Sequence, residues 1–242
     1  MSGHSKWATI KRQKGTADIK RGQQFTKLAN AIVIAVRQNG GNTDPETNFK
    51  LRLSIDKARM YNMPKENIER AIGKGKGAVD SGELHEALYE GFAPGGAAIL
   101  IEAVTDNKQR TVSEVKNVLE KSGGTLASQG GVSYLFEHLG EIAALTSGKT
   151  ADALFDIAVE MESKDYTEED GDVIFYVDAK HLYSAKKMLE EKGMTVSSAE
   201  LVYKPLNALE VTPEVQLKLT SLVDKLEELG DVQNVFLNAP LS

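Results

Sequence analysis

The chain has 242 residues, of which 41% are hydrophobic and 26% are charged, and it contains no cysteine. This composition is typical of an ordinary soluble globular protein and excludes disulfide scaffolds, thiolate metal sites and cysteine nucleophiles. At about 150 residues per domain, the length predicts one or two domains, or three if each is small. A reducing, cytoplasmic location fits best.

The formal net charge of −6 conceals a strongly polarised distribution. Residues 1–77 contain 16 Lys and Arg against 6 Asp and Glu, a net charge of +10. Residues 78–242 contain 13 against 29, a net charge of −16. This asymmetry predicts a polyanionic partner for the first segment and a solubilising or protein-facing role for the second.

Apolar spacing predicts three amphipathic helices in the basic segment, over about 18–39, over about 46–61, and from Pro64 to Gly73. The longest apolar run, 31–36, is far shorter than the roughly 20 residues that a membrane helix needs. Residues 73–77 hold three glycines and two lysines, a pattern that predicts a flexible basic linker and a domain boundary near residue 78.

Beyond residue 78 the pattern alternates between strands and helices. We predict a strand at 97–104, a helix with an apolar stripe over 112–119, and a short strand at 132–136. That helix begins at Asp106 or Asn107, or at a capping box formed by Thr111 and Glu114. The later elements are predicted at 141–145 (strand), 151–161 (helix), near 163–166 (strand), 173–177 (strand), 179–191 (helix), 195–202 (strand), 208–211 (strand), from Pro213 (helix) and 231–237 (strand).

Counting these elements predicts an α+β protein, with an N-terminal three-helix domain followed by two ferredoxin-like α/β sandwich domains. The set within 141–204 is complete by itself, whereas the sets before and after it each supply half of a sandwich. We therefore predict a basic helical domain at 1–77, a discontinuous domain at 78–140 plus 205–242, and an acidic inserted domain at 141–204.

Motifs of catalysis are absent from the sequence. The four histidines are far apart, and neither a nucleophile elbow nor a nucleotide-binding P-loop occurs. We predict no catalytic residue, no metal ligand and no cofactor, and hence no enzyme. Two alternatives stay open: an enzyme with its site in a cleft between the α/β domains, using acids such as Glu102 or Asp106, and a protein-binding adaptor that acts through the acidic insertion.

The start of the chain carries the strongest candidate site. Clustered cations displace the counterions of a phosphate backbone, and an aromatic ring among them is typical of nucleic-acid binding. No motif for reading bases is present, so the charge alone does not separate DNA from RNA. The predicted nucleic-acid-binding residues are Lys6, Trp7, Lys11, Arg12, Lys14, Lys20, Arg21 and Lys27.

Several longer motifs resemble those of the YebC/PmpR family, which includes the mitochondrial translational activator of cytochrome c oxidase subunit one. The resemblance runs from residue 1 to about residue 238. The motifs that carry it are Met1-Ser2-Gly3-His4-Ser5-Lys6-Trp7, Arg21-Gly22, Phe25-Thr26-Lys27-Leu28, Leu51-Arg52-Leu53, Ile55-Asp56-Lys57-Ala58-Arg59, Asn62-Met63-Pro64-Lys65, Asn67-Ile68-Glu69-Arg70-Ala71-Ile72, Tyr89-Glu90-Gly91, Pro94-Gly95-Gly96, Thr105-Asp106-Asn107 and Asp231-Val232-Gln233-Asn234-Val235.

The resemblance implies a helical domain followed by two α/β domains, in agreement with the count of elements. It also implies a cytoplasmic, non-enzymatic regulator of gene expression. Members of the family are described as DNA-binding transcriptional regulators and as ribosome-associated factors that relieve stalling at consecutive prolines. The expected partners are therefore DNA or ribosomal RNA through the basic domain, the ribosome or another protein through the acidic domains, and no membrane.

Overall fold

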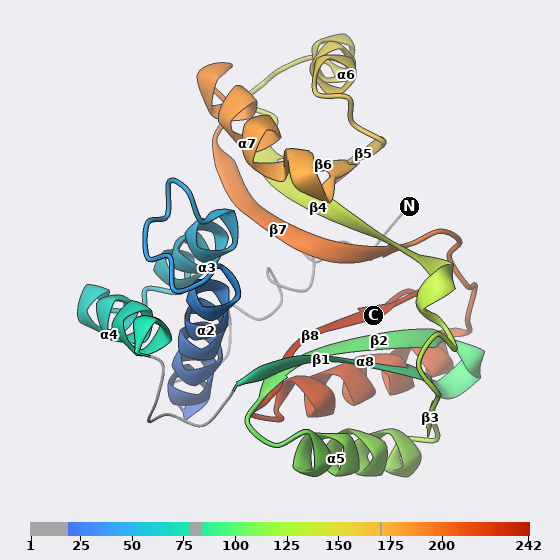
Figure 1. Cartoon of the computed structure of the whole chain (residues 1–242). Coiled ribbons are helices and arrows are strands. Elements are labelled where there is room, and N and C mark those ends of the chain that lie inside the picture. The colour runs from blue at the N-terminus through green and yellow to red at the C-terminus, as the bar shows by residue number, and fades with distance from the viewer. Residues whose placement is uncertain (1–18, 78–83, 170) are drawn as a thin grey trace. The chain divides into compact units, whose positions relative to one another are not determined.

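The computed structural model describes residues 19–77, 84–169 and 171–242 (Figure 1). By their contacts the described residues divide into two compact units. One unit comprises residues 136–207, within which the predicted insertion 141–204 falls. The other contains a helical part up to residue 77 and a helix-and-sheet part made of residues 84–135 and 208–242. The second unit is therefore discontinuous in sequence.

Three amphipathic helices form the helical part, as predicted. They are α2 (Ile19–Gln38), α3 (Phe49–Met60) and α4 (Lys65–Lys76). Their apolar stripes meet in one core, in which Ile32, Val36 and Leu51 are fully buried. Asn48 caps α3 by accepting a 3.1 Å hydrogen bond from the Leu51 N–H, and its amide donates to the carbonyl of Ala35 at 2.9 Å. This one side chain therefore starts α3 and ties it to α2.

The flexible linker predicted at residues 73–77 is wrong, because α4 continues to Lys76. Gly75 is buried, and a Cβ at this position would stand 2.7 Å from the Cβ of Val36. Glycine in a helix interior costs about 1 kcal/mol relative to alanine. Here that cost is offset by packing, since only a residue without a side chain lets α4 approach α2 this closely.

The helix-and-sheet part of the same unit has an antiparallel sheet in the order β3-β1-β2-β8. β1 and β2 pair along their whole length, from His85 opposite Thr105 to Phe92 opposite Ala98. The core contains buried side chains of β2, α5 and α8, among them Ile99, Leu119 and Leu222. The elements are β1 (His85–Phe92), the 3-10 turn η1 (Pro94–Gly96), β2 (Ala98–Thr105), α5 (Lys108–Lys121), β3 (Thr125–Leu126), the 3-10 turn η2 (Ser133–Leu135), α8 (Pro213–Glu227) and β8 (Val232–Leu237).

Two short strands predicted for this part are wrong. Residues 133–135 form η2, and the backbone N–H of Val132 donates to a carboxylate, that of Glu90, rather than to a neighbouring strand. Residues 208–211 are apolar because Leu209 and Val211 pack against the core, but they form no strand. Of the two starting points considered for α5, the earlier is confirmed, since Asn107 accepts a 3.0 Å hydrogen bond from the N–H of Arg110.

The inserted unit forms a second antiparallel sheet, in the order β5-β6-β4-β7. Its chain order, β-α-β-β-α-β, is the one predicted. Gly140 lies under α7, where a Cβ would stand 2.8 Å from the Cβ of Leu182, so glycine lets the helix lie close to the sheet. The elements are β4 (Phe136–Leu145), α6 (Ala151–Glu160), β5 (Asp165–Glu169), β6 (Asp172–Asp178), the 3-10 turn η3 (Ala179–His181), α7 (Leu182–Glu191) and β7 (Val196–Pro205).

The predicted fold class is confirmed: helices come first, and two ferredoxin-like α/β sandwiches follow. The two sheets differ in connectivity. In the inserted sheet the inner strand β6 follows the edge strand β5 directly. In the other sheet the corresponding inner strand, β1, precedes β2 and is joined to it as a hairpin. The strand absent from the predicted elements, β1, therefore completes this sheet from its N-terminal side.

Candidate nucleic-acid interface

The predicted phosphate-binding residues fall into three groups. Arg21 is exposed on α2. Lys27 is buried, with 7% of its surface exposed, and its ammonium donates a hydrogen bond to the carbonyl of Glu227, so it contributes to packing within its unit. The side chains outside the described residues are those of Lys6, Trp7, Lys11, Arg12, Lys14 and Lys20.

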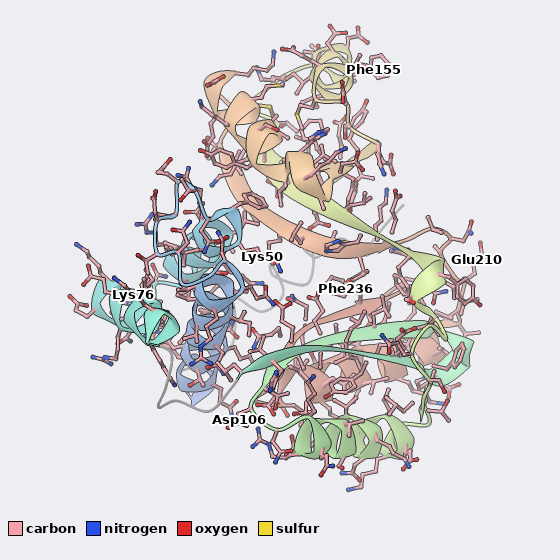
Figure 2. All side chains as sticks on the ribbon, in the orientation of Figure 1. Lys50, Lys76, Asp106, Phe155, Glu210 and Phe236 are labelled. Atoms are coloured by element: carbon pink, nitrogen blue, oxygen red, sulfur yellow. The ribbon has the colours of Figure 1, made fainter. Side chains whose placement is uncertain are left out.

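The last two turns of α4 present a group of cations that the predicted set does not contain. Arg70, Lys74 and Lys76 are exposed there, and Lys76 is labelled in Figure 2. Among the described residues neither lysine has an ion-pair partner, and the guanidinium of Arg70 donates only to the amide oxygen of Asn67, at 3.4 Å. We call Arg70, Lys74 and Lys76 the α4 cation group.

Helical spacing explains how these cations are presented. Arg70 and Lys74 are four residues apart and so lie on one face, away from Ile68, Ala71 and Gly75, which are buried. Lys74 and Lys76 also have a structural role, because cations in the last turn of a helix interact favourably with its C-terminal carbonyls. The sequence places these two lysines in a Lys-Gly-Lys alternation, but the three glycines of residues 73–77 predict a linker rather than a helix that presents them.

Most other exposed cations of the helical part are paired with acids. Arg59 lies 3.8 Å from Asp56, and Lys65 lies 3.6 Å from Glu69. Lys50 lies 3.9 Å from Glu86 and also donates to the amide oxygen of Gln38 at 2.8 Å. Exposed pairs of this kind contribute at most about 1 kcal/mol to stability, but they reduce the charge that a phosphate would meet. The α4 cation group is therefore more available to an anion than the cations of α3.

The motif Tyr89-Glu90-Gly91 has a structural role. The Glu90 side chain is 4% exposed and accepts hydrogen bonds from three backbone N–H groups, those of Gly130 at 2.7 Å and of Val132 and Ser133 at 2.8 Å. Burial alone would raise the pKa of this carboxyl, but these hydrogen bonds together outweigh burial and hold the pKa below its usual value. Glu90 therefore fixes the loop 130–133.

Two other motifs, Thr105-Asp106-Asn107 and the one that begins at Asp231, meet in a second polar cluster. One carboxylate oxygen of Asp231 accepts from Arg110 at 2.7 Å, from Thr111 at 2.7 Å and from Thr105 at 3.0 Å. Partial burial would raise the pKa of Asp231, but the hydrogen bonds from Arg110 and the two threonines lower it. This cluster fastens the start of α5 to the start of β8.

The two acids considered for an enzymatic site serve the same framework. Asp106 pairs with Arg110 at 2.9 Å, and Glu102 accepts a 2.7 Å hydrogen bond from the amide of Asn234. Among the described residues, no group of three or more His, Asp or Glu side chains is arranged to hold a metal ion. No helix in the described part of the chain is long and apolar enough to span a membrane.

Comparison with known proteins gives a consistent result along the whole chain. Residues 5–78 match the family model of the TACO1/YebC protein N-terminal domain, and residues 84–239 match that of the TACO1/YebC second and third domain. A probable transcriptional regulatory protein of Dehalococcoides mccartyi is 46% identical over 239 residues, which cover 99% of this chain and 94% of the relative. One of Caldanaerobacter subterraneus is 40% identical over 242 residues, covering 100% and 99%. The crystal structure of a conserved hypothetical protein from Aquifex aeolicus is similar, with a TM-score of 0.87, 40% identity and 98% of each chain covered.

Proposed function

The chain belongs to the TACO1/YebC family, and from this premise we propose that it is a non-enzymatic, nucleic-acid-binding regulator of gene expression. Relatives that match over 94% and 99% of their own length are named probable transcriptional regulatory proteins. The observation that carries the nucleic-acid part of the proposal is the net charge of +10 on residues 1–77, followed by −16 on the remainder. Clustered cations on one part of a chain favour a polyanion as its partner.

The proposed contact surface joins the start of the chain to the exposed cations of the helices. Lys27 is left out because its ammonium is buried and bonded to a backbone carbonyl. Trp7 supplies a ring on which an unpaired base could stack. The proposed phosphate contacts are Lys6, Lys11, Arg12, Lys14, Lys20, Arg21, Arg70, Lys74 and Lys76.

Such contacts position a protein on a nucleic acid without reading its sequence. This chemistry fits both partners that the family resemblance implies: DNA, at the promoters of regulated genes, and ribosomal RNA, on ribosomes stalled at consecutive prolines. Crosslinking in growing cells separates them. We expect either enrichment at promoter DNA or crosslinks to ribosomal RNA with co-sedimentation on ribosomes. Recovery of neither would contradict the proposal.

Substitutions that remove positive charge test which of these residues contact phosphate. The variants are Lys11→Gln/Arg12→Gln/Lys14→Gln and Lys74→Gln/Lys76→Gln, and the matched control is Lys116→Gln/Lys121→Gln, which removes two exposed lysines from α5. The measurement is the affinity for a DNA duplex and for a double-stranded RNA over a range of salt concentrations. For each lost DNA contact the slope of log K against log salt should flatten by about 0.9.

The expected result is a flatter slope for both test variants and an unchanged slope for the control. An unchanged slope in the triple variant would remove the start of the chain from the interface. An unchanged slope in the double variant would leave the lysines of α4 with their structural role at the end of a helix. Equal flattening in the control would indicate attraction to charge in general rather than a defined surface.

A further inference from the structure

The first half of β1 has an open edge. In the sheet order, β1 lies between β2 and β3, but β3 has only two residues and pairs with Gly91 and Phe92. One further backbone bond, from the Ala127 N–H to the Glu90 carbonyl at 2.8 Å, extends this pairing. Beyond it, no strand among the described residues covers the outer side of β1 from residue 85 to residue 89.

The bond between Glu90 and Ala127 shows which backbone groups of β1 are open. Along a strand, successive residues direct their N–H and C=O groups to opposite edges. Glu90 bonds outward to Ala127, so Leu88 and Glu86 also direct their backbone groups outward. Neither residue has a backbone hydrogen bond on that side within the described part of the chain. Within the described residues, two N–H donors and two carbonyl acceptors therefore stand unpaired along this edge.

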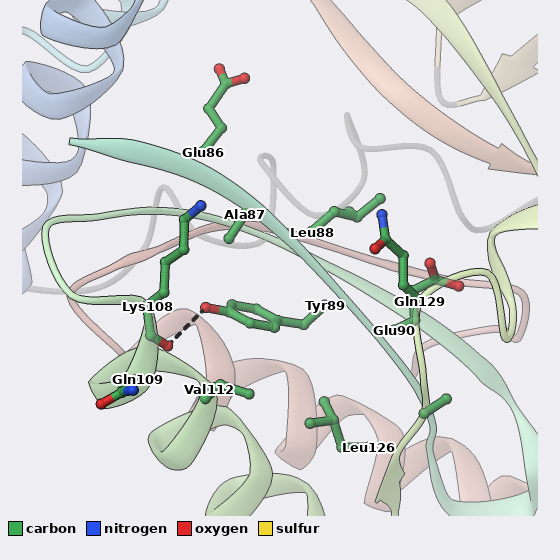
Figure 3. Close-up of a pocket in the computed structure, with 11 residues that line it drawn as sticks. Glu86, Ala87, Leu88, Tyr89, Glu90, Lys108, Gln109, Val112, Leu126 and Gln129 are labelled. Atoms are coloured by element: carbon green, nitrogen blue, oxygen red, sulfur yellow. Dashed lines mark hydrogen bonds between the residues drawn. The ribbon is translucent and has the colours of Figure 1, made fainter. Parts of the chain in front are cut away.

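A pocket of about 510 Å³ runs beside this open edge (Figure 3). The first half of α5 forms its opposite wall, with Lys108, Gln109 and Val112, while Leu126 and Gln129 close one end. The ring of Tyr89 lies within it, and the Tyr89 hydroxyl donates to the carbonyl of Lys108 at 3.4 Å. A groove with a strand edge on one side and a helix on the other can accept an added strand.

The charges of the groove specify what kind of strand fits it. Lys108 is exposed, has no ion pair among the described residues, and extends from α5 toward β1 (Figure 3). The acids that also line the pocket are not directed at it: the Glu90 carboxylate is taken up by three backbone N–H groups, and Glu86 turns away from α5 and lies 3.9 Å from Lys50. Among the described residues that line the groove, Lys108 is therefore the charged side chain that has no partner for its charge.

We propose that this groove binds an extended, acidic peptide segment of a partner protein, which adds to the open edge of β1 as a strand. Its backbone pairs with Glu86 and Leu88 along the line that β3 begins. Its carboxylate side chain faces Lys108, and a small apolar side chain enters the pocket beside Tyr89 and Val112. The residues of this site lie outside the helical part of the chain and differ from those proposed for the nucleic-acid interface.

The test starts from a displayed library of random 12-residue peptides selected against the full-length protein. We expect enriched sequences to combine acidic and apolar residues. Their binding should slow hydrogen exchange at the amides of Glu86 and Leu88, because a bonded N–H exchanges only when the pair opens. Enriched peptides that leave these two amides unprotected, or that are basic, would overturn the proposal, as would a library from which no peptide is enriched.

Three variants locate the site. Leu88→Pro removes one outward N–H without removing a bond to β2, and Lys108→Glu reverses the charge of the groove; each should weaken the selected peptide about tenfold. The control, Lys121→Glu, makes the same charge change at the other end of α5 and should leave binding unchanged. If Leu88→Pro does not fold, as judged by circular dichroism, Lys108→Glu on the helix surface decides the outcome.

Equal binding by Lys108→Glu and Lys121→Glu would overturn the assignment of the charge. A dimer in sedimentation that becomes a monomer in Leu88→Pro would show that a second copy of the chain occupies the edge. Protection of Glu86 and Leu88 by single-stranded RNA rather than by peptide would assign the edge to the nucleic acid. Either of these two results would overturn the proposal of a peptide partner.

Discussion

The two sheets have the same arrangement of strands but differ in how well one inner strand is covered. In the inserted unit, β6 pairs with β4 on one side and with five residues of β5 on the other. In the other sheet, β1 pairs with β2 along eight residues but with only two residues of β3. The comparison teaches that the length of an edge strand, rather than the strand order, decides whether a sheet keeps backbone groups available to a partner.

Carboxylates differ in role between buried and exposed positions. Both units bury some of them: Glu90 in the unit that contains β1, and Glu141, Asp172 and Glu200 in the inserted unit. Backbone N–H groups satisfy Glu90, and Arg110 and two threonines satisfy the partly buried Asp231. On the surface of the inserted unit, Lys164 lies 2.5 Å from Glu137 and 2.9 Å from Asp178. A buried, fully bonded carboxylate organises a loop, whereas an exposed pair contributes little to stability.

Proline substitution should give the largest contrast between the two sheets. Ile174→Pro lies in β6, which is paired on both sides, and should destabilise its unit by about 3 kcal/mol, since proline removes a ladder bond and strains the strand. Leu88→Pro on the open edge should cost only about 1 kcal/mol beyond Leu88→Ala. Urea unfolding followed by hydrogen exchange in each unit measures both, and equal costs would show that the edge of β1 is paired in solution.

Removing the buried carboxylate should have the next largest effect. Glu90→Gln preserves the size of the side chain but replaces an oxygen that accepts backbone hydrogen bonds with an amide that donates, so we expect a loss of about 3 kcal/mol. Glu86→Gln on the same strand is the matched control and should change stability by less than about 0.5 kcal/mol. Exchange of the Gly130 and Val132 amides should accelerate only in Glu90→Gln, and a stable loop in that variant would contradict the role of Glu90.

The pH dependence should distinguish the same loop. The pKa of Glu90 is lowered by folding, so its contribution is complete above the unfolded value near 4.5 and is lost as the pH falls through the lower folded value. We therefore expect the amides of residues 130–133 to lose protection in that acidic range. Glu90→Gln should remove this pH dependence, and a dependence that persists in the variant would have to come from another group, such as Asp231.

The smallest effect is expected in the inserted unit. Lys164→Met removes the surface pairs with Glu137 and Asp178, and we expect a small loss in the free energy of unfolding that shrinks further in high salt. Lys187→Met, which removes an exposed pair within α7, is the control. Thermal unfolding at low and high salt measures the difference. A salt-independent loss would mean that the chain of Lys164 acts through packing.

The amino-acid sequence by itself determined the helices, the charge asymmetry and the complete inserted sandwich. These features depend on local periodicity: apolar residues every three or four positions predict α2 and α3, and alternation bounded by turns predicts the strands of 141–204. The resemblance to a family came from the same local strings of residues, such as the one around Trp7. None of these inferences requires knowing which segments are neighbours in space.

Only the tertiary structure decided the features that depend on two distant segments meeting. Gly75 belongs to a helix because it packs against Val36, and Val132 belongs to a loop because its N–H reaches Glu90, 42 residues away in sequence. The α4 cation group and the open edge of β1 also depend on how segments that are distant in sequence pack together. Periodicity shows which face of an element is buried, but the partner that buries it, or that is missing, is set by contacts between residues far apart in the chain.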